Sequence, residues 1–186
     1  MVFTEEKTLT VHEFLDLDNF EEGYLYELIN GEIMKRASPD TEHQSTSANL
    51  LRRLFQHVPD SGIGKIFHAP YDVYLDDENL VQPDLIFVSQ ANEGIVQKGC
   101  IMGVPDLVVE ILSPGTYRTD RGPKFKLYQR LGVAEYWIAD PRSKTIEIYT
   151  LTEGVYDLIA LGEEGGTVES LLLPGLVITV NDVFGR

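Results

Sequence analysis

Apolar residues along this chain recur with helical and strand periods in turn, which predicts alternating helices and strands. Residues 10–17 (TVHEFLDL) predict a short helix that Thr10 caps, with Glu13 at the capping-box position. Residues 24–36 predict a hairpin, because Asn30-Gly31 is a strong two-residue turn signal. Ser38-Pro39 then predicts the start of a helix. Its apolar positions follow helical spacing: Ala48, Leu51, Leu54, Phe55 and Val58.

The middle of the chain predicts strands joined by one longer helix. Strands are expected at residues 64–76, 81–88, 105–112 and 135–140, with a short helix or loop near 90–98. Residues 121–132 predict a helix that Gly132 closes. The segment 105–140 therefore reads strand, helix, strand, which predicts a right-handed parallel crossover.

The remaining sequence predicts short strands separated by turns, in the runs TIEIYTL, GVYDLIAL and LVITV. No repeat, low-complexity tract or Pro/Gly/Ser linker interrupts the chain, so residues 1–186 are expected to form a single domain. The predicted class is α/β, bordering on α+β, with a mixed central sheet, flanking helices and additional antiparallel hairpins.

Composition adds a strongly acidic balance, with 15 basic and 30 acidic residues and a net charge of −15. Such a charge opposes non-specific binding to nucleic acid. The basic residues are unevenly spread, however, because five fall close together: Arg118, Arg121, Lys124, Lys126 and Arg130. This basic strip is compatible with a polyanionic substrate, although on charge alone a solvated helix face is the better explanation.

Several classes of protein and of site are excluded. No apolar run approaches the length of a membrane span, and the N-terminus lacks the pattern of a secretory signal, so a cytoplasmic protein is expected. Cys100 is the only cysteine, which excludes an intrachain disulfide and a cysteine zinc site. No P-loop, HExxH, GxSxG or GxGxxG motif is present. Ser113 in LSPGT is interpreted as part of a turn.

Two carboxylates stand in unusual positions, Asp84 in QPDLIFV and Glu110 in PDLVVEIL, each within an apolar run that predicts a buried strand. A buried, unpaired carboxylate is costly, so each needs a partner. The two could be separate structural ions, or they could share a divalent cation.

A basic group is expected beside them. At about 100° per residue, Lys124 shares a helical face with Leu127, Tyr128 and Leu131, whereas Lys126 and Arg130 fall on the opposite face. Lys124 should therefore point toward the sheet. Asp84 and Glu110 suit Mg²⁺ or Mn²⁺, and a nearby lysine could orient an attacking water. Together these residues predict metal-assisted hydrolysis of phosphodiester bonds.

The runs PDLVVEILSPGT, DRGPKFKLY and GVAEYWIADP resemble the Uma-type restriction endonuclease family of the PD-(D/E)xK superfamily. The segments YELINGEI, EHQ and VQPDLIFVS match that family in the same order, so the resemblance covers roughly residues 10–150. It implies a restriction-endonuclease-like core and a divalent-metal site built from Asp84 and Glu110.

This chain departs from the superfamily's standard pattern at Leu112, where a lysine would usually follow the acid. The resemblance to Uma-type proteins instead places the basic group at Lys124. Glu27 matches a further acidic position and could bind a second metal or hold a water, or it could be an ordinary hairpin residue. His43 could approach the cleft, although a satisfied core histidine is the simpler interpretation. Five aromatic residues are expected in the core or in cross-strand pairs: Tyr71, Tyr74, Tyr128, Tyr136 and Trp137.

The leading hypothesis is a Mg²⁺-dependent endonuclease acting on DNA, with Asp84, Glu110, Lys124 and Glu27 in its catalytic site. A non-catalytic domain that binds nucleic acid or protein is the main alternative, and the net charge favours it. A metal-dependent hydrolase of a smaller phosphate ester is the third. The expected partners are DNA and a second copy of the chain, and no membrane.

Overall fold

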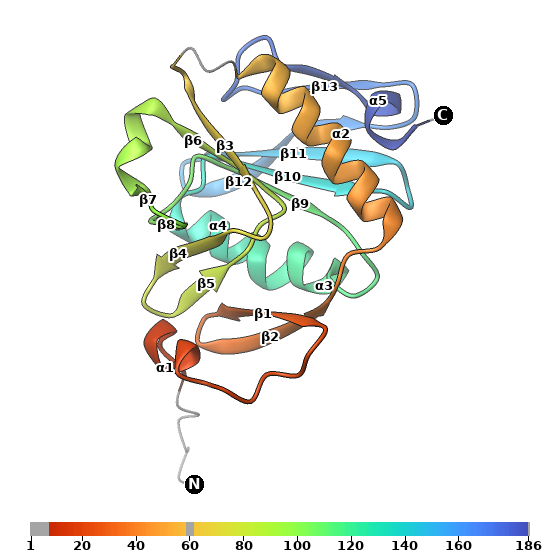
Figure 1. The fold of residues 1–186 in the computed structure, drawn as a ribbon. Coiled ribbons are helices and arrows are strands. Elements are labelled where there is room, and N and C mark those ends of the chain that lie inside the picture. Colours follow the sequence, from red (N-terminus) through yellow and green to blue (C-terminus); the bar gives the residue numbers. More distant parts are fainter. Residues whose placement is uncertain (1–7, 59–61, 186) are drawn as a thin grey trace, which may run out of the picture.

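Two six-stranded sheets make up most of the protein in this computed structural model, which describes residues 8–58 and 62–185 (Figure 1). The first sheet has the strand order β2 (Glu32–Ala37), β1 (Tyr24–Ile29), β5 (Asn79–Val81), β4 (Asp72–Asp76), β8 (Cys100–Met102) and β7 (Val96–Gln97). The second has the order β12 (Val155–Gly162), β11 (Thr145–Thr152), β10 (Glu135–Asp140), β9 (Leu107–Ile111), β6 (Leu85–Ser89) and β3 (Gly64–His68). A short pair, β13 (Thr167–Glu169) and β14 (Val177–Thr179), forms a separate two-stranded sheet that packs against the second one.

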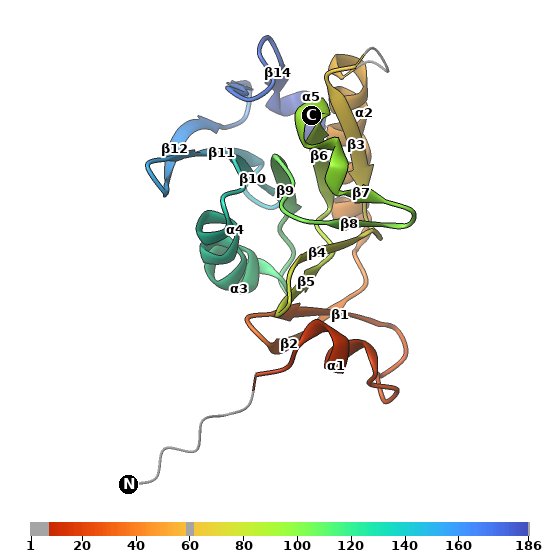
Figure 2. The same ribbon diagram turned by 90° about the vertical axis from the view of Figure 1, so that its left-hand side faces the viewer.

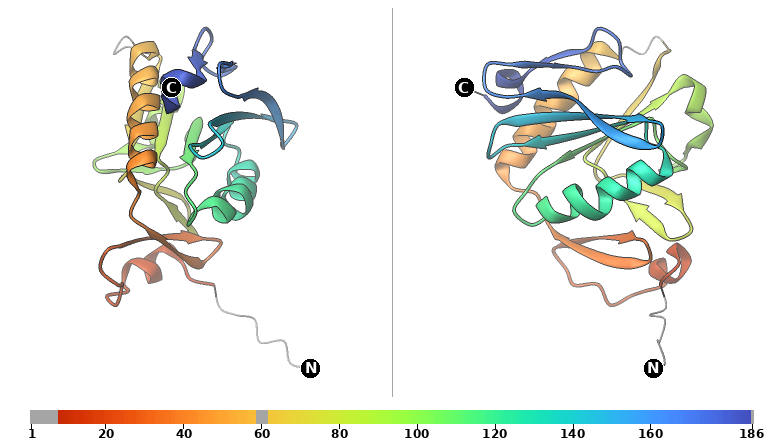
Figure 3. Two further views of the ribbon diagram at one scale, coloured as in Figure 1. Left: turned by 90° about the vertical axis from the view of Figure 1, so that its right-hand side faces the viewer. Right: turned by 180° about the vertical axis from the view of Figure 1, so that it is seen from behind.

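Helices cover both faces of the second sheet. The helix α2 (Thr41–His57) crosses one face, and a continuous helical stretch crosses the other (Figures 2 and 3). That stretch consists of α3 (Tyr117–Thr119), the π-helical turn η2 (Asp120–Lys124) and α4 (Phe125–Leu131). The short elements α1 (Val11–Leu15), η1 (Gln90–Ile95) and α5 (Val180–Phe184) complete the described helices. Large mixed sheets flanked by few helices confirm the predicted fold class. Within the described ranges, no helix has the length and apolar character needed to cross a membrane.

The predicted crossover is present, because β9 and β10 pair in parallel and are joined by the α3–α4 stretch. Gly132, at φ 91°, ends α4 in the left-handed conformation as expected. The hairpin β1–β2 is also confirmed, with Asn30 and Gly31 at φ 51° and 72°. The capping box of Thr10 and Glu13 forms at the start of α1.

Successive side chains of β9 point to opposite faces, and both faces are buried. Val109 and its neighbours two residues away pack in a core cluster with Leu50 and Leu54 of α2. Val108 and Leu112 belong to a second cluster with Leu127 and Tyr128 of α4. Glu110 therefore points toward α4, into the cluster that also contains apolar residues of the first sheet.

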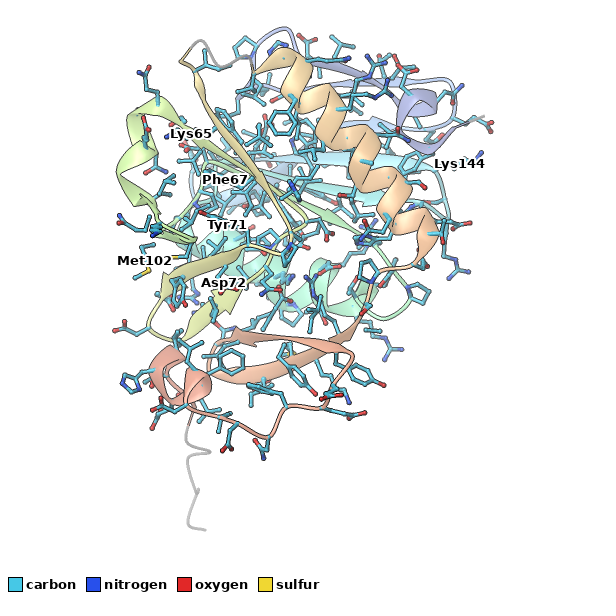
Figure 4. The ribbon with its side chains drawn as sticks, viewed as in Figure 1. Lys65, Phe67, Tyr71, Asp72, Met102 and Lys144 are labelled. Carbon is cyan, nitrogen blue, oxygen red and sulfur yellow. The ribbon has the colours of Figure 1, made fainter. Side chains whose placement is uncertain are left out.

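Two predicted strands are wrong as single elements. Residues 64–76 divide into β3 and β4, and the run at 81–88 divides between β5 and β6, with each pair split between the two sheets. The breaks fall at Pro70 and Pro83, which lack the N–H that a continuous ladder requires. Asp84 consequently lies just before β6 and not inside a strand. Phe67, Tyr71 and Asp72 mark the first crossing in Figure 4, where the rings of Phe67 and Tyr71 stack 5.0 Å apart.

Helix boundaries also differ from the prediction. The helix expected from Ser38-Pro39 begins at Thr41, because the Asp40 carboxylate accepts from the N–H of His43 and caps it. Phe55, expected on its apolar face, is 53% exposed. The helix expected at 121–132 begins earlier, at Tyr117, so Lys124 lies in its middle instead of its first turn. The run LVITV gives only three strand residues before α5 begins at Val180.

Candidate active site

A buried lysine joins three carboxylates where the two sheets meet α4. Lys124 Nζ lies 2.9 Å from Glu27 Oε1 and 2.9 Å from Glu110 Oε1, and 3.7 Å from Asp120 Oδ1. The four residues come from β1, β9 and the η2 turn, and each is at most 2% exposed. The expectation that Lys124 points toward the sheet and neighbours Glu110 agrees with this arrangement.

The helical spacing around Lys124 explains how one face supplies these contacts. Asp120 and Tyr128 stand four residues before and after Lys124, so all three share a face. The Tyr128 hydroxyl donates a hydrogen bond of 2.8 Å to Glu110 Oε1, the same oxygen that accepts from Lys124. One carboxylate oxygen of Glu110 is therefore fixed by two donors.

Asp84 lies beside the same strand and is held from the opposite face. Its Oδ2 atom accepts a hydrogen bond of 2.7 Å from the N–H of Ile111, the residue after Glu110. The same oxygen is 3.1 Å from Nε2 of His43, which projects from α2. His43 is thus both buried and in contact with Asp84, and its Nδ1 atom has no hydrogen-bond partner among the described residues.

Glu27 is not an ordinary exposed hairpin residue. It is 2% exposed, and its Oε1 atom accepts from the N–H of Gln82 at 2.7 Å as well as from Lys124. Gln82 lies at the second crossing between the sheets, two residues before Asp84. Glu27 therefore ties the first sheet to the segment that carries Asp84.

Burial and mutual repulsion raise the proton affinity of this cluster. Burial raises the pKa of Glu110 to about 8 against the opposing effect of Lys124, and burial raises the pKa of Asp120 to about 6. Burial alone would lower the pKa of Lys124. The charges of Glu110 and Glu27 have the larger effect, so the pKa of Lys124 is above its ordinary value. Lys124 is therefore an ammonium ion at neutral pH. Three carboxylates surround this one buried ammonium and Asp84 lies on the adjoining backbone, so the cluster favours additional positive charge.

The cluster offers few oxygen donors to a divalent cation. Across residues 8–58 and 62–185, no group of three or more His, Cys, Asp or Glu side chains is arranged to hold a metal ion. Mg²⁺ often uses only one or two carboxylates and keeps several waters. Among contacts of the described residues, Oδ1 of Asp84 and Oε2 of Glu110 accept no hydrogen bond. A pair of hard oxygen donors remains, which fits such an ion.

A cavity of about 340 Å³ gives access to Asp84. Its walls include His43 of α2, Arg36 of β2, and Ser113 and Thr116 of the turn after β9. Arg36 donates to the carbonyl oxygen of Gln82 at 3.0 Å. A larger cavity of about 630 Å³ lies between α1 and β4, and none of these site residues lines it.

Asp120, Tyr128 and Arg36 are site residues that sequence reasoning missed. Asp120 and Tyr128 could have been found from their spacing of four residues from Lys124. Arg36 carries no such signal, because β2 alternates between exposed and half-buried positions without a buried face. The basic strip does not form one surface, since Lys124 is buried and Arg121 pairs with Glu147 at 2.6 Å. Its other three members are exposed: Arg118, Lys126 and Arg130.

Comparisons with known proteins relate this chain to nucleases. A family model described as "Uma2: Putative restriction endonuclease" matches residues 11–181. The chain also resembles the crystal structure of "a putative nuclease belonging to DUF820" from Anabaena variabilis, with a TM-score of 0.76 and 21% sequence identity. That similarity covers 95% of this chain and 97% of the other. No curated protein matches the sequence.

Proposed function

Since the chain belongs to the Uma2 restriction endonuclease family, we propose that it is a metal-dependent endonuclease that hydrolyses phosphodiester bonds in DNA. Family membership and the nuclease-like fold support a nuclease acting on nucleic acid. The choice of DNA, the dependence on Mg²⁺ or Mn²⁺ and the roles of single residues are the proposal.

The observation that carries the proposal is the buried contact of Lys124 with Glu27 and Glu110 beside Asp84. A purely structural ion pair would need one carboxylate for one ammonium. Here the lysine has two hydrogen-bonded carboxylates and a third nearby, and Asp84 contributes another charge on the adjoining backbone. Such a concentration of buried carboxylates with raised pKa values is typical of a functional site, and a bound cation would stabilise their charged forms.

Asp84 and Glu110 would hold the cation through the oxygens that no hydrogen bond uses. When bound, a divalent ion supplies Lewis acidity toward the phosphate and makes a water more acidic. Asp84 is kept in place by His43 and the Ile111 N–H, and Glu110 by Tyr128 and Lys124. The protein therefore orients both carboxylates from opposite faces of β9.

Lys124 would act on the substrate as a hydrogen-bond donor. An ammonium has three N–H donors, and Glu27 and Glu110 use two of them. The third can orient the attacking water or stabilise the charge that develops on a phosphate oxygen. Because its pKa is raised, Lys124 would not serve as a general base at neutral pH. Glu27 would be the residue that positions Lys124.

Single-turnover cleavage of plasmid DNA with Mg²⁺ or Mn²⁺ tests the proposal. We expect Lys124→Ala to lower the cleavage rate by ~10²-fold or more, the effect of losing a positioned electrostatic group. Lys126→Ala is the matched control, since Lys126 has the same charge two residues away and is exposed. It should cost only a small, salt-sensitive factor.

Metal binding is measured separately by calorimetric titration with Mn²⁺. Asp84→Asn and Glu110→Gln should each abolish it, with circular dichroism to establish that the variants fold. Equal rates for the two lysine variants would remove Lys124 from the catalytic site. A wild-type protein that never cleaves with any metal would instead be a non-catalytic domain that binds nucleic acid or protein. Cleavage restricted to small phosphate esters would favour the third hypothesis.

A further inference from the structure

A third cavity, of about 590 Å³, lies where the carboxyl ends of the parallel strands β9 and β10 meet. Its walls include the turn after β9, the start of α3 and the turn between β10 and β11. The chemistry of its lining comes from Tyr117, Arg118, Asp140 and Arg142. The volume lies in the range of sites that enclose a small organic ligand.

This cavity adjoins the candidate active site. Ser113 lines both this cavity and the one that opens to Asp84. The turn between them is fixed, because the N–H of Thr116 donates to Ser113 Oγ and the N–H of Ser113 donates to Thr116 Oγ1, both at 3.2 Å. A chain molecule lying in one cavity can therefore continue into the other over the Ser113–Thr116 turn.

The cavity carries two arginines free for a ligand. Arg118 and Arg142 are both exposed, and neither side chain forms an ion pair within residues 8–58 and 62–185. By contrast, neighbouring Arg121 is paired with Glu147. Asp140 is the one carboxylate on the described wall, and it accepts the backbone N–H of Arg142 at 2.9 Å. In a chain with a net charge of −15, two unpaired guanidinium groups beside the site indicate an anionic ligand.

Tyr117 adds an exposed aromatic ring to the same cavity. Tyr117 is 48% exposed, although its backbone is fixed by a 3.0 Å hydrogen bond from its N–H to the carbonyl oxygen of Ser113. The Arg121 guanidinium carbon lies 5.3 Å from the ring centroid and supports it. The neighbouring rings of Phe125, Tyr128 and Tyr136 pack in the core. Tyr117 differs from them because its ring is accessible to a ligand.

We propose that this cavity is a nucleotide subsite, in which an unpaired base stacks on Tyr117 and the adjoining phosphates contact Arg118 and Arg142. An exposed ring beside unpaired cations is the combination with which proteins bind single-stranded nucleic acid. The inference rests on the proposed function, because it takes the ligand to be the strand that enters the cavity at Asp84. It adds that the protein binds a strand with at least one unstacked nucleotide.

Fluorescence anisotropy with a labelled 12-nucleotide single strand of DNA, in EDTA so that no cleavage occurs, tests the subsite. We expect Tyr117→Ala to weaken binding roughly 5- to 150-fold, the range for loss of one stacked base, and Tyr117→Phe to retain most affinity. Arg118→Ala and Arg142→Ala should each reduce the slope of log affinity against log salt by ~0.7. The fully paired duplex should respond less to Tyr117→Ala than the single strand.

Two control variants match these changes. Tyr24→Ala removes an exposed tyrosine on β1, and Lys126→Ala removes an exposed cation on α4. Wild-type affinity in Tyr117→Ala, or an equal loss of salt dependence in Lys126→Ala, would overturn the subsite. That result would leave the proposed function intact if wild-type cleavage still needs metal. Loss of binding in the subsite variants of a protein that never cleaves would support the subsite and overturn the proposed endonuclease.

Discussion

At the residue scale, Glu110 and Lys124 depend on each other for their charges. Glu110 is buried among apolar side chains, and Lys124 opposes the effect of burial on its pKa. Removing the lysine would leave Glu27, Glu110 and Asp120 buried without their cation, which is strongly destabilising unless protons are taken up. Lys124 is therefore a structural residue as well as a proposed catalytic one, and its variants need a folding control.

The raised pKa of Glu110 predicts how stability changes with pH in metal-free protein. Between its ordinary value of 4.5 and the folded value of about 8, the folded state holds a proton that the unfolded state has lost. Stability from this group is therefore greatest at low pH and falls as the pH rises from about 5 to about 8. Thermal midpoints measured across that range should decline, and Glu110→Gln should reduce the decline.

Asp120 and His43 act in the same direction. Burial raises the pKa of Asp120 to about 6. Burial alone would lower the pKa of His43, but the hydrogen bond to Asp84 and the charge of Asp84 have the larger effect, so the pKa of His43 is raised. Some decline should therefore persist in Glu110→Gln. A wild-type midpoint that rises steadily over this range, or an unchanged slope in the variant, would contradict the assignment to Glu110.

The charged residues were the most predictable part of the site. Asp84, Glu110 and Lys124 could be found because a charge in an apolar run, or on an apolar helix face, requires a partner. Asp120 and Tyr128 follow from their spacing of four residues from Lys124, but the contact of His43 with Asp84 could not be predicted, because it depends on how α2 packs on β9. The π-helical turn, which contains Pro123, also shifts the helix start in a way that regular periodicity does not reveal.

At the element scale, the β1–β2 hairpin positions Glu27 through a turn with little space around it. A Cβ atom added to Gly31 would lie 2.4 Å from Cβ of Thr8 and 3.0 Å from the backbone N of Leu9. The N–H of Leu9 donates to the carbonyl oxygen of Gly31 at 3.0 Å, so the segment before α1 covers this turn directly.

Gly31→Ala should therefore destabilise the protein more than the same change at a comparable turn. Gly154, in the β11–β12 hairpin, has φ 83° and no atom within 4 Å of an added Cβ among the described residues. Both substitutions strain a positive φ, but only Gly31→Ala adds the steric clash, which should cost about 1–3 kcal/mol more. Urea denaturation of the two variants measures this difference, and equal losses would mean that the segment before α1 moves aside freely.

The sequence predicted where helices and strands occur better than it predicted which strands pair with each other. The hairpin, the crossover and the strand 135–140 follow from turn residues and local periodicity, which act over a few positions. The passage of the chain between two sheets at Pro70 and Pro83 could not be predicted, because the flanking apolar runs look continuous. Only the prolines indicated a break, and a proline does not specify which sheet the next strand joins.

At the scale of the whole molecule, the second sheet ends at the strand β12, of which only the last residues pack against β13. β12 pairs only with β11 among the described strands, and Leu158 and Leu161 on it are 50% and 51% exposed. An edge strand with exposed apolar residues is a surface on which a second copy can pair through the same strand. We propose this edge as the contact of the expected homodimer.

Light scattering should then give twice the mass of one chain, and Leu158→Lys should shift the protein to a monomer. Leu171→Lys is the control, because Leu171 is 63% exposed but lies outside β12. A monomeric wild type would reject the homodimer. A dimer that Leu158→Lys leaves intact would place the contact elsewhere.

The alternation along β9 has a consequence for how this gene can change. Because both faces of the strand are apolar, deleting one codon before Glu110 would leave a sequence just as hydrophobic and able to pair with β6 and β10. The deletion would nevertheless carry the carboxylate from the α4 side, where Lys124 and Tyr128 lie, to the side of α2. Substitutions among Leu, Val and Ile in this strand should be tolerated in evolution, whereas the number of residues between Leu107 and Glu110 should hardly ever vary.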